Sequence, residues 1–111
     1  MAKLEEYQKY ILQIIYEYGK VKPAYGDTEV QIIVDKENHH YQLMVVGWNQ
    51  LQRVYGCMLH IDIKNNKIWI QHDGTEIGIA NELLELGVSK EDIVLAFQAP
   101  YKRSLRGFAT G

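Results

Sequence analysis

Residues 53 to 76 read Arg53-Val-Tyr-Gly-Cys-Met-Leu-His-Ile-Asp-Ile-Lys-Asn-Asn-Lys-Ile-Trp-Ile-Gln-His-Asp-Gly-Thr-Glu76, and this stretch decides the fold. Apolar and polar side chains alternate on both sides of Asn65-Asn66, which is the pattern of two half-buried strands. Asparagine tolerates the positive φ of a type I′ turn, so the pattern predicts an antiparallel hairpin. One hairpin face is predicted to carry Leu59, Ile61, Ile63, Ile68, Ile70 and His72, and the other His60, Asp62, Trp69 and Gln71.

The same alternation occurs upstream of the hairpin. It runs from Thr28 to Val34 and resumes after the turn residues Asp35-Lys-Glu-Asn-His with Tyr41, Leu43 and Val45. A turn closed at Glu37-Asn38 sets three apolar pairs opposite each other, namely Val34–Tyr41, Ile32–Leu43 and Val30–Val45. Together with the hairpin, these strands predict a four-stranded antiparallel meander.

The face of this sheet opposite the predicted core is unusually apolar. It is expected to carry Ile33, Met44, Val46, Val54, Met58 and Trp69. A sheet face of this composition does not normally face water. Either a helix or a second subunit covers it, and the pattern favours a homodimer or a hetero-complex.

One helix is predicted before the meander in the sequence and another after it. Apolar residues at three- and four-residue steps predict a helix over residues 2–18 that ends at Gly19. A second helix, capped by Asp73 or by Thr75, should bury Ile79, Leu83, Leu84 and Leu86 and stop at Gly87. Ser89 should cap a further short turn or helix, and the apolar run 93–97 is either a strand or a buried helix segment. The fold class is therefore α+β, with helices covering the sheet.

Length and composition favour a single cytoplasmic domain. A chain of 111 residues fits one domain with one core, here residues 1–111. The single cysteine, Cys57, excludes an internal disulfide and suits a reducing compartment. No apolar run is long enough to cross a bilayer, and the acidic start is not that of a signal peptide. We therefore expect a cytoplasmic protein without membrane contact.

The charge distribution is uneven. A net charge of −2 argues against a dedicated nucleic-acid binder. The tail 101–111, however, contains Lys102, Arg103 and Arg106 and no acidic residue. This tail could contact phosphate or an acidic partner, whereas the simpler interpretation is a flexible, solvated terminus.

Histidine and carboxylate side chains invite a metal-site interpretation, since both types bind divalent cations. His60 and Asp62 share a predicted strand face, but His72 is predicted on the core face, and His39-His40 should diverge in a turn. Cys57 is likewise predicted on the opposite face from His60, which leaves the thiol without a base. Capping accounts for Asp73 and Glu76. We therefore predict no catalytic, cofactor-binding or metal-ligating residue.

Several runs, spread over nearly the whole chain, carry a family resemblance: Tyr25-Gly-Asp-Thr-Glu-Val30, His40-Tyr-Gln-Leu43, Val46-Gly-Trp48, Tyr55-Gly-Cys-Met-Leu-His-Ile-Asp-Ile-Lys64, Lys67-Ile-Trp-Ile-Gln-His-Asp-Gly-Thr-Glu76, Ile79-Ala-Asn-Glu-Leu83, Gly87-Val-Ser-Lys90 and Asp92-Ile-Val-Leu95. In this order they resemble the XisI family, the fdxN element excision controlling factor proteins of cyanobacteria. The resemblance implies a small α+β accessory protein. Such a protein would act with a nuclease-like companion, XisH, in controlling excision of a DNA element by a separate recombinase during heterocyst differentiation. It implies no catalytic residue.

Three functional hypotheses follow. The first is a non-enzymatic factor that controls DNA excision by binding an XisH-like protein through Met44, Val46, Met58 and Trp69. The second is direct DNA binding through Lys102, Arg103 and Arg106. The third is a small metal-dependent hydrolase centred on His60, Asp62, His72 and Asp73.

Overall fold

The computed structural model describes residues 2–20, 26–75 and 78–111. Its elements in chain order are α1 (Ala2–Gly19), β1 (Asp27–Asp35), β2 (His40–Asn49), β3 (Gln52–Lys64), β4 (Lys67–Asp73), α2 (Ile79–Glu85), the 3-10 helix η1 (Lys90–Asp92), β5 (Ile93–Leu95) and the 3-10 helix η2 (Pro100–Arg106). The five strands form one sheet in the order β1-β2-β3-β4-β5, and β5 is parallel to β4 while the other neighbours are antiparallel. The predicted α+β class and the four-stranded meander are confirmed. The run 93–97 supplies the strand β5, which adds a fifth member to the sheet.

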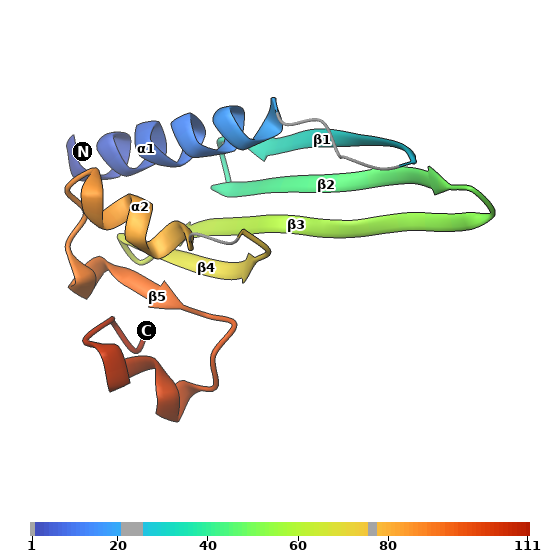
Figure 1. Cartoon of the computed structure of the whole chain (residues 1–111). Helices are drawn as coiled ribbons and strands as arrows, with labels where there is room; N and C mark the ends of the chain where they lie inside the picture. Colours follow the sequence, from blue (N-terminus) through green and yellow to red (C-terminus); the bar gives the residue numbers. More distant parts are fainter. Residues whose placement is uncertain (1, 21–25, 76–77) are drawn as a thin grey trace.

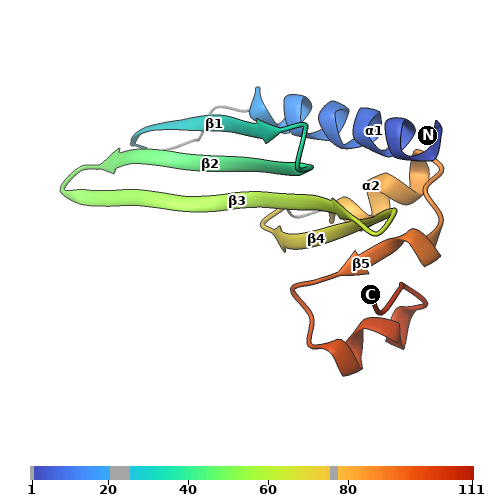
Figure 2. The same cartoon turned by 180° about the vertical axis from the view of Figure 1, so that it is seen from behind.

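The two α-helices pack on one face of the sheet. Figure 1 shows α1 running alongside β1 and β2, with α2 beside β4, and Figure 2 shows the same arrangement from behind. In both views β2 and β3 run past the end of β4 and form an arm. The fully buried core residues come from α1, α2 and the strands, among them Ile11, Ile15, Tyr41, Leu43, Leu59, Ile61, Ile68, Ile70, Ile79, Leu83, Ile93 and Val94. Among the described helices, none has both the length and the apolar character needed to cross a membrane.

The first helix is held along its whole length. Its stripe of apolar residues is buried, as the three- and four-residue spacing predicts, with Ile11 and Ile15 completely inaccessible. At its first turns, Lys3 forms an ion pair of 2.8 Å with Asp92, and Tyr7 donates its hydroxyl to the same carboxylate. At its last residue, a Cβ on Gly19 would lie 2.6 Å from Cδ1 of Ile32, so the helix end approaches β1 closely. Contacts with η1 at its start and with β1 at its end therefore hold α1 in place.

The predicted pairing of β1 with β2 and the predicted turn between β3 and β4 are confirmed. Val34 pairs with Tyr41, Ile32 with Leu43 and Val30 with Val45. Asn65 and Asn66 both have positive φ, 52° and 61°, as a type I′ turn requires. Turn chemistry and apolar pairing therefore set these registers locally.

Two bulges alter the predicted faces of β3 and β4. Leu43 pairs with Leu59 but Met44 pairs with Cys57, so Met58 is an extra residue in β3. Likewise His60 pairs with His72 and Ile61 with Ile70, which leaves Gln71 as the extra residue in β4. An extra residue reverses the alternation of side chains on its far side.

Four predicted placements are wrong for this reason. Met58 packs against the core cluster, and its carbonyl accepts a bond from the Gly74 amide. Val54, opposite Gly47, lies on the core side of the sheet, whereas Cys57 lies with Met44 on the face of His60. His72 leaves the core face and is exposed opposite His60.

We use the term outer face for the sheet face opposite α1 and α2. On β2 and β3 its members are His40, Gln42, Met44, Val46, Trp48, Arg53, Tyr55, Cys57, His60, Asp62 and Lys64. The C-terminal segment, residues 96–111, folds back beside β5. The amide of Ala96 donates to the carbonyl of Ile70, the amide of Ala109 donates to the carbonyl of Ile93, and Ala109 forms a β-bridge with Val94. The segment thus adds to the sheet edge at β5, which Figure 1 shows as the red part of the chain.

The corner between β4 and α2 depends on Asp73. Its Oδ1 accepts bonds from the amide and hydroxyl of Thr75, and its Oδ2 accepts the amide of Ile79, the first residue of α2, at 2.8 Å. Thr75 Oγ1 also accepts the Gly78 amide at 3.3 Å. Asp73 and Thr75 therefore bond backbone N–H groups at this corner, but the prediction that one of them is the N-cap of the helix is wrong, because α2 begins at Ile79 and its N-cap residue is Gly78. Glu76 lies outside the described residues. Ser89 caps η1 as predicted, accepting the amide of Glu91.

Candidate functional site

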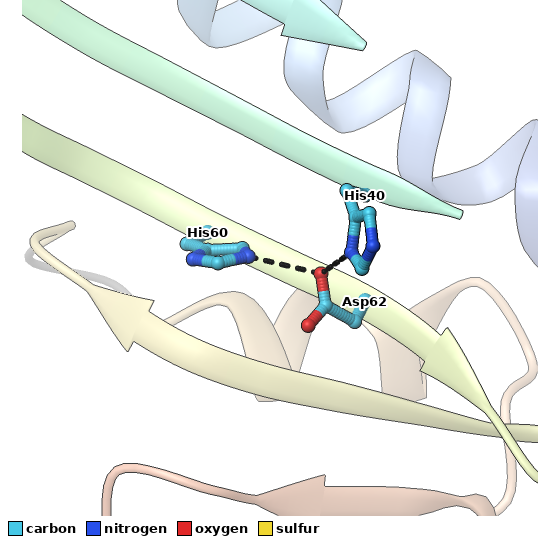
Figure 3. A group of neighbouring side chains, drawn as sticks. All are labelled: His40, His60 and Asp62. Carbon is cyan, nitrogen blue, oxygen red and sulfur yellow. Dashed lines mark hydrogen bonds and ion pairs between the residues drawn. The ribbon is translucent and has the colours of Figure 1, made fainter. Parts of the chain in front are cut away.

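Two histidines converge on one carboxylate oxygen on the outer face. Oδ1 of Asp62 lies 2.8 Å from Nδ1 of His40 and 2.9 Å from Nε2 of His60. Figure 3 shows both imidazoles directed at this oxygen. One ligand atom from each residue can be chosen so that all three lie within 4.8 Å of one another. We call this group the His-Asp-His cluster.

Strand pairing assembles the cluster. His40 is the first residue of β2 and is the direct partner of Asp62 on β3, while Gln42 is the partner of His60. His60 and Asp62 are two residues apart on one strand, so their side chains share a face. The bulge at Met58 lies before both residues and leaves this part of the register regular.

Neighbouring amides surround the cluster. Gln71 donates from Nε2 to Oδ2 of Asp62 at 3.2 Å, and Nε2 of Gln42 lies 3.4 Å from Nδ1 of His60. The Asp62 side chain is 15% exposed, whereas those of His60 and His40 are 29% and 55% exposed. The carboxylate is therefore shielded on the protein side, and the imidazoles lie between it and the solvent. Such a group can hold an ion pair or bind a divalent cation.

The structure changes the predicted set of metal-type residues. The sequence pattern predicted that His60 and Asp62 share a face, but it placed His40 in a turn and so left it out of any metal site. In the structure His40 begins β2 and completes the cluster. Of the other proposed members, His72 is exposed opposite His60, and the carboxylate of Asp73 accepts the amide of Ile79 at the start of α2. The prediction that these groups fail to converge is therefore wrong for His40. Extending the β2–β3 register outward from the apolar pair Leu43–Leu59 would have found it.

Cys57 is on the same outer face, yet its environment disfavours the thiolate. Burial raises the pKa of this thiol above its ordinary value. The Sγ donates to the carbonyl of Leu59 at 3.3 Å. A protonated thiol is a poor nucleophile, which agrees with the predicted inert cysteine.

The four predicted interface residues separate into two groups. Met44 and Val46 are half-buried on the outer face, as expected. Met58 contributes to the core, and Trp69 lies beneath the C-terminal segment, with the Arg103 guanidinium 5.7 Å and the Lys64 ammonium 4.8 Å from its ring centroid.

Other aromatic residues take the exposed positions next to Met44 and Val46. Trp48 is 50% exposed and Tyr55 is 70% exposed. The guanidinium of Arg53 lies 5.5 Å from the Trp48 ring centroid and 5.8 Å from that of Tyr55. Trp48 was missed as an interface residue, although the alternation that predicted Val46 on the outer face also places Trp48 there, two residues later.

One of the three basic residues of the tail forms hydrogen bonds within the C-terminal segment. Arg103 donates to the carbonyls of Gln98, Ala96 and Thr110 at 3.1 to 3.3 Å. Lys102 is exposed above the ring of Tyr101, and the side chain of Arg106 lies outside the described residues. Arg103 therefore has a structural role in the C-terminal segment.

Comparison with known proteins extends over the whole chain. The family model described as XisI protein matches residues 1–110. A XisI-like protein from Anabaena variabilis ATCC 29413 is 44% identical, with a TM-score of 0.91 over 97% of this chain and 99% of that one. The structure of fdxN element excision controlling factor XisI from the same organism is 34% identical, with a TM-score of 0.87 over 98% of this chain and 99% of that one. No curated protein matches the chain. The matching family model and the two full-length structural relatives show that this chain belongs to the XisI family.

Proposed function

We propose that this XisI-family protein is a non-enzymatic accessory factor that controls site-specific excision of a DNA element by binding a protein partner, an XisH-like companion. The related structure described as an fdxN element excision controlling factor supports the process, at 34% identity over nearly the whole chain. The observation that carries the proposed mode of action is the exposed aromatic surface at the end of the β2–β3 arm.

This arm surface consists of Met44, Val46, Trp48, Arg53 and Tyr55. Pairing across the two strands makes it continuous, because Trp48 is opposite Arg53 and Val46 is opposite Tyr55. Tryptophan, tyrosine and arginine are the residue types that most often carry binding energy in protein interfaces. Each keeps an apolar body and a polar group, so the surface can exclude water and still form hydrogen bonds.

Charged residues border the arm surface on one side. Asp27 and Glu29 on β1 lie next to Trp48 and Val46, and both are exposed. A polar rim around an apolar and aromatic centre is the usual composition of a non-obligate interface. The partner surface that fits is apolar at its centre with basic groups at the side of β1.

Co-expression with the XisH-like companion tests the proposal. Trp48→Asp and Met44→Asp should each weaken recovery of the companion on the tagged protein by at least about 10-fold, the effect of losing one interface anchor. Tyr16→Asp is the matched control, because Tyr16 is 47% exposed but lies on α1 rather than on the arm. Circular dichroism and urea unfolding should show both arm variants folded. Full recovery of the companion by both folded arm variants would exclude this surface as the binding site.

The same proteins distinguish two other occupants of the surface. Light scattering of the protein alone would assign the arm surface to a second copy if a dimer became a monomer in Trp48→Asp. A labelled DNA duplex tests direct contact, which should weaken with salt and in Lys102→Ala if the tail binds phosphate. Companion binding that is lost only in the arm variants supports the accessory role.

A further inference from the structure

We propose that the His-Asp-His cluster is a binding site for one divalent transition-metal ion, with a ligand set suited to Zn²⁺. This site goes beyond the partner-binding role and does not depend on it. The geometry, the neighbouring amides and the exposure of the three residues each support it.

Two imidazole nitrogens lie beside one carboxylate oxygen, and the three possible ligand atoms are within 4.8 Å of one another. A tetrahedral zinc site with bonds of about 2.0–2.2 Å places its ligand atoms about 3.3–3.6 Å apart. The two observed separations from Asp62 Oδ1 are 2.8 and 2.9 Å, to His40 and His60. Small rotations of the two imidazoles would therefore open the space for an ion without moving the strands. Two histidines and one carboxylate are a recurrent set for Zn²⁺ and for Fe²⁺, and imidazole favours both over Mg²⁺ or Ca²⁺.

The backbone holds the ligands in fixed positions. His40 and Asp62 are direct partners on adjacent strands in the middle of the sheet, and His60 is two residues from Asp62. Ligands carried by paired strands are held more precisely than ligands on loops. The residues beneath them, Tyr41 and Ile61, are fully buried and anchor both strands in the core.

Gln71 has the position of a supporting group outside the ligands. Its amide donates to Oδ2 of Asp62, the oxygen that neither histidine approaches. Such hydrogen bonds orient the carboxylate of a metal site and keep its other oxygen directed at the ion. Gln71 reaches this position because it is the extra residue of the β4 bulge. The bulge therefore contributes directly to the proposed site.

Exposure leaves room to complete the coordination. The side chains become more exposed from Asp62 to His60 to His40, so an ion bound among them would have protein on one side and solvent on the other. Three protein ligands and a free position are the arrangement in which zinc retains a water or accepts a group from another molecule.

Calorimetric titration of the full chain with ZnCl₂ tests the site, using protein without a histidine tag that has been treated with a chelator. We expect one ion per chain. His60→Ala and Asp62→Asn should each weaken binding by at least about 10-fold. His39→Asn is the matched control, because His39 is the neighbour of His40 in sequence, contacts Tyr41 Oη instead, and has a φ of 59° that asparagine tolerates.

Side-chain nitrogen NMR of the unsubstituted protein gives a second measurement that does not depend on the variants folding. Zn²⁺ should shift Nδ1 of His40 and Nε2 of His60 and leave His39 unchanged. Absence of saturable binding, or equal affinity in folded His60→Ala and Asp62→Asn, would show that the cluster is only hydrogen-bonded. Zinc-induced shifts confined to other histidines would overturn the assignment in the same way.

Discussion

The guanidinium of Arg103 lies over the indole of Trp69, 5.7 Å from the ring centroid, and joins η2 to β4 across the edge of the sheet. The same guanidinium bonds three carbonyls of the C-terminal segment. One side chain therefore connects the chain end to the outer face of the sheet.

Arg103→Ala should release this segment. Loss of hydrogen bonds from a charged donor should cost about 1–3 kcal/mol of stability. Hydrogen exchange should accelerate at the amide of Ala109, which bonds Ile93, while α1 keeps its protection. Lys102→Ala is the control, because Lys102 is the exposed neighbour of Arg103. Unchanged exchange at Ala109 in Arg103→Ala would contradict the structural role of Arg103.

Acid should destabilise the protein partly through Asp92. Burial alone would raise the pKa of this carboxyl, but the ion pair with Lys3 and the bond from Tyr7 outweigh it and hold the pKa below its ordinary value. As pH falls, the unfolded chain binds the proton first, at about pH 4, so the stabilisation is lost below that pH and is present above it.

Urea unfolding between pH 3 and pH 7 measures the effect. Asp92→Asn should be less stable than the parent protein at pH 7 and should lose less stability on acidification. Glu91→Gln, a substitution at the exposed neighbouring carboxylate, should keep the parent's slope. Equal slopes in Asp92→Asn and the parent would show that Asp92 contributes nothing to the acid response.

Gly47 should not accept a side chain. Its φ is +146°, and a Cβ there would lie 2.2 Å from the carbonyl oxygen of Asp27 on the neighbouring strand. Gly47→Ala should therefore cost about 2 kcal/mol or more, since β1 and β2 must separate or the backbone must shift. Gly56→Ala is the control on the adjacent strand, where a Cβ meets no atom within 4 Å, and it should change stability by less than about 1 kcal/mol. Thermal or urea unfolding compares the two variants, and equal stabilities would refute the close approach.

The thiol of Cys57 should react slowly. Because burial raises its pKa, the folded protein has less thiolate near neutral pH than an unfolded chain. Reaction with a disulfide reagent at pH 7.5 should be at least several-fold slower in the folded protein than in concentrated urea, and its pH–rate midpoint should lie above the ordinary value of about 8.5. A folded protein that reacts as fast as the unfolded chain would mean that the site is open.

Repeating that reaction with the companion present also tests the proposed function. Cys57 is opposite Met44 on the outer face, next to the arm surface. A bound partner should slow the reaction further, whereas Tyr16→Asp should not change this protection.

Local sequence information determined much of this protein. The Asn65-Asn66 turn, the pairing of Val34 with Tyr41, the buried stripe of α1 and the capping of η1 by Ser89 each follow from the preferences of a few adjacent residues or from one short apolar match. Such features depend on backbone sterics and on period-two or period-3.6 burial, which a sequence displays directly. The runs shared with the XisI family likewise identified the family from the sequence, and the comparisons confirm it.

Only the tertiary structure determined which side chains lie on which face of the sheet beyond each bulge, and which distant segments are in contact. Met58 and Gln71 are extra residues in β3 and β4, and each reverses the alternation of side chains beyond it. His40 meets Asp62 only because β2 and β3 pair in one register, and Arg103 meets Trp69 only because the chain end folds back beside β5. Sequence periodicity records which residues are buried within one element, whereas these contacts depend on how separate elements pair and pack.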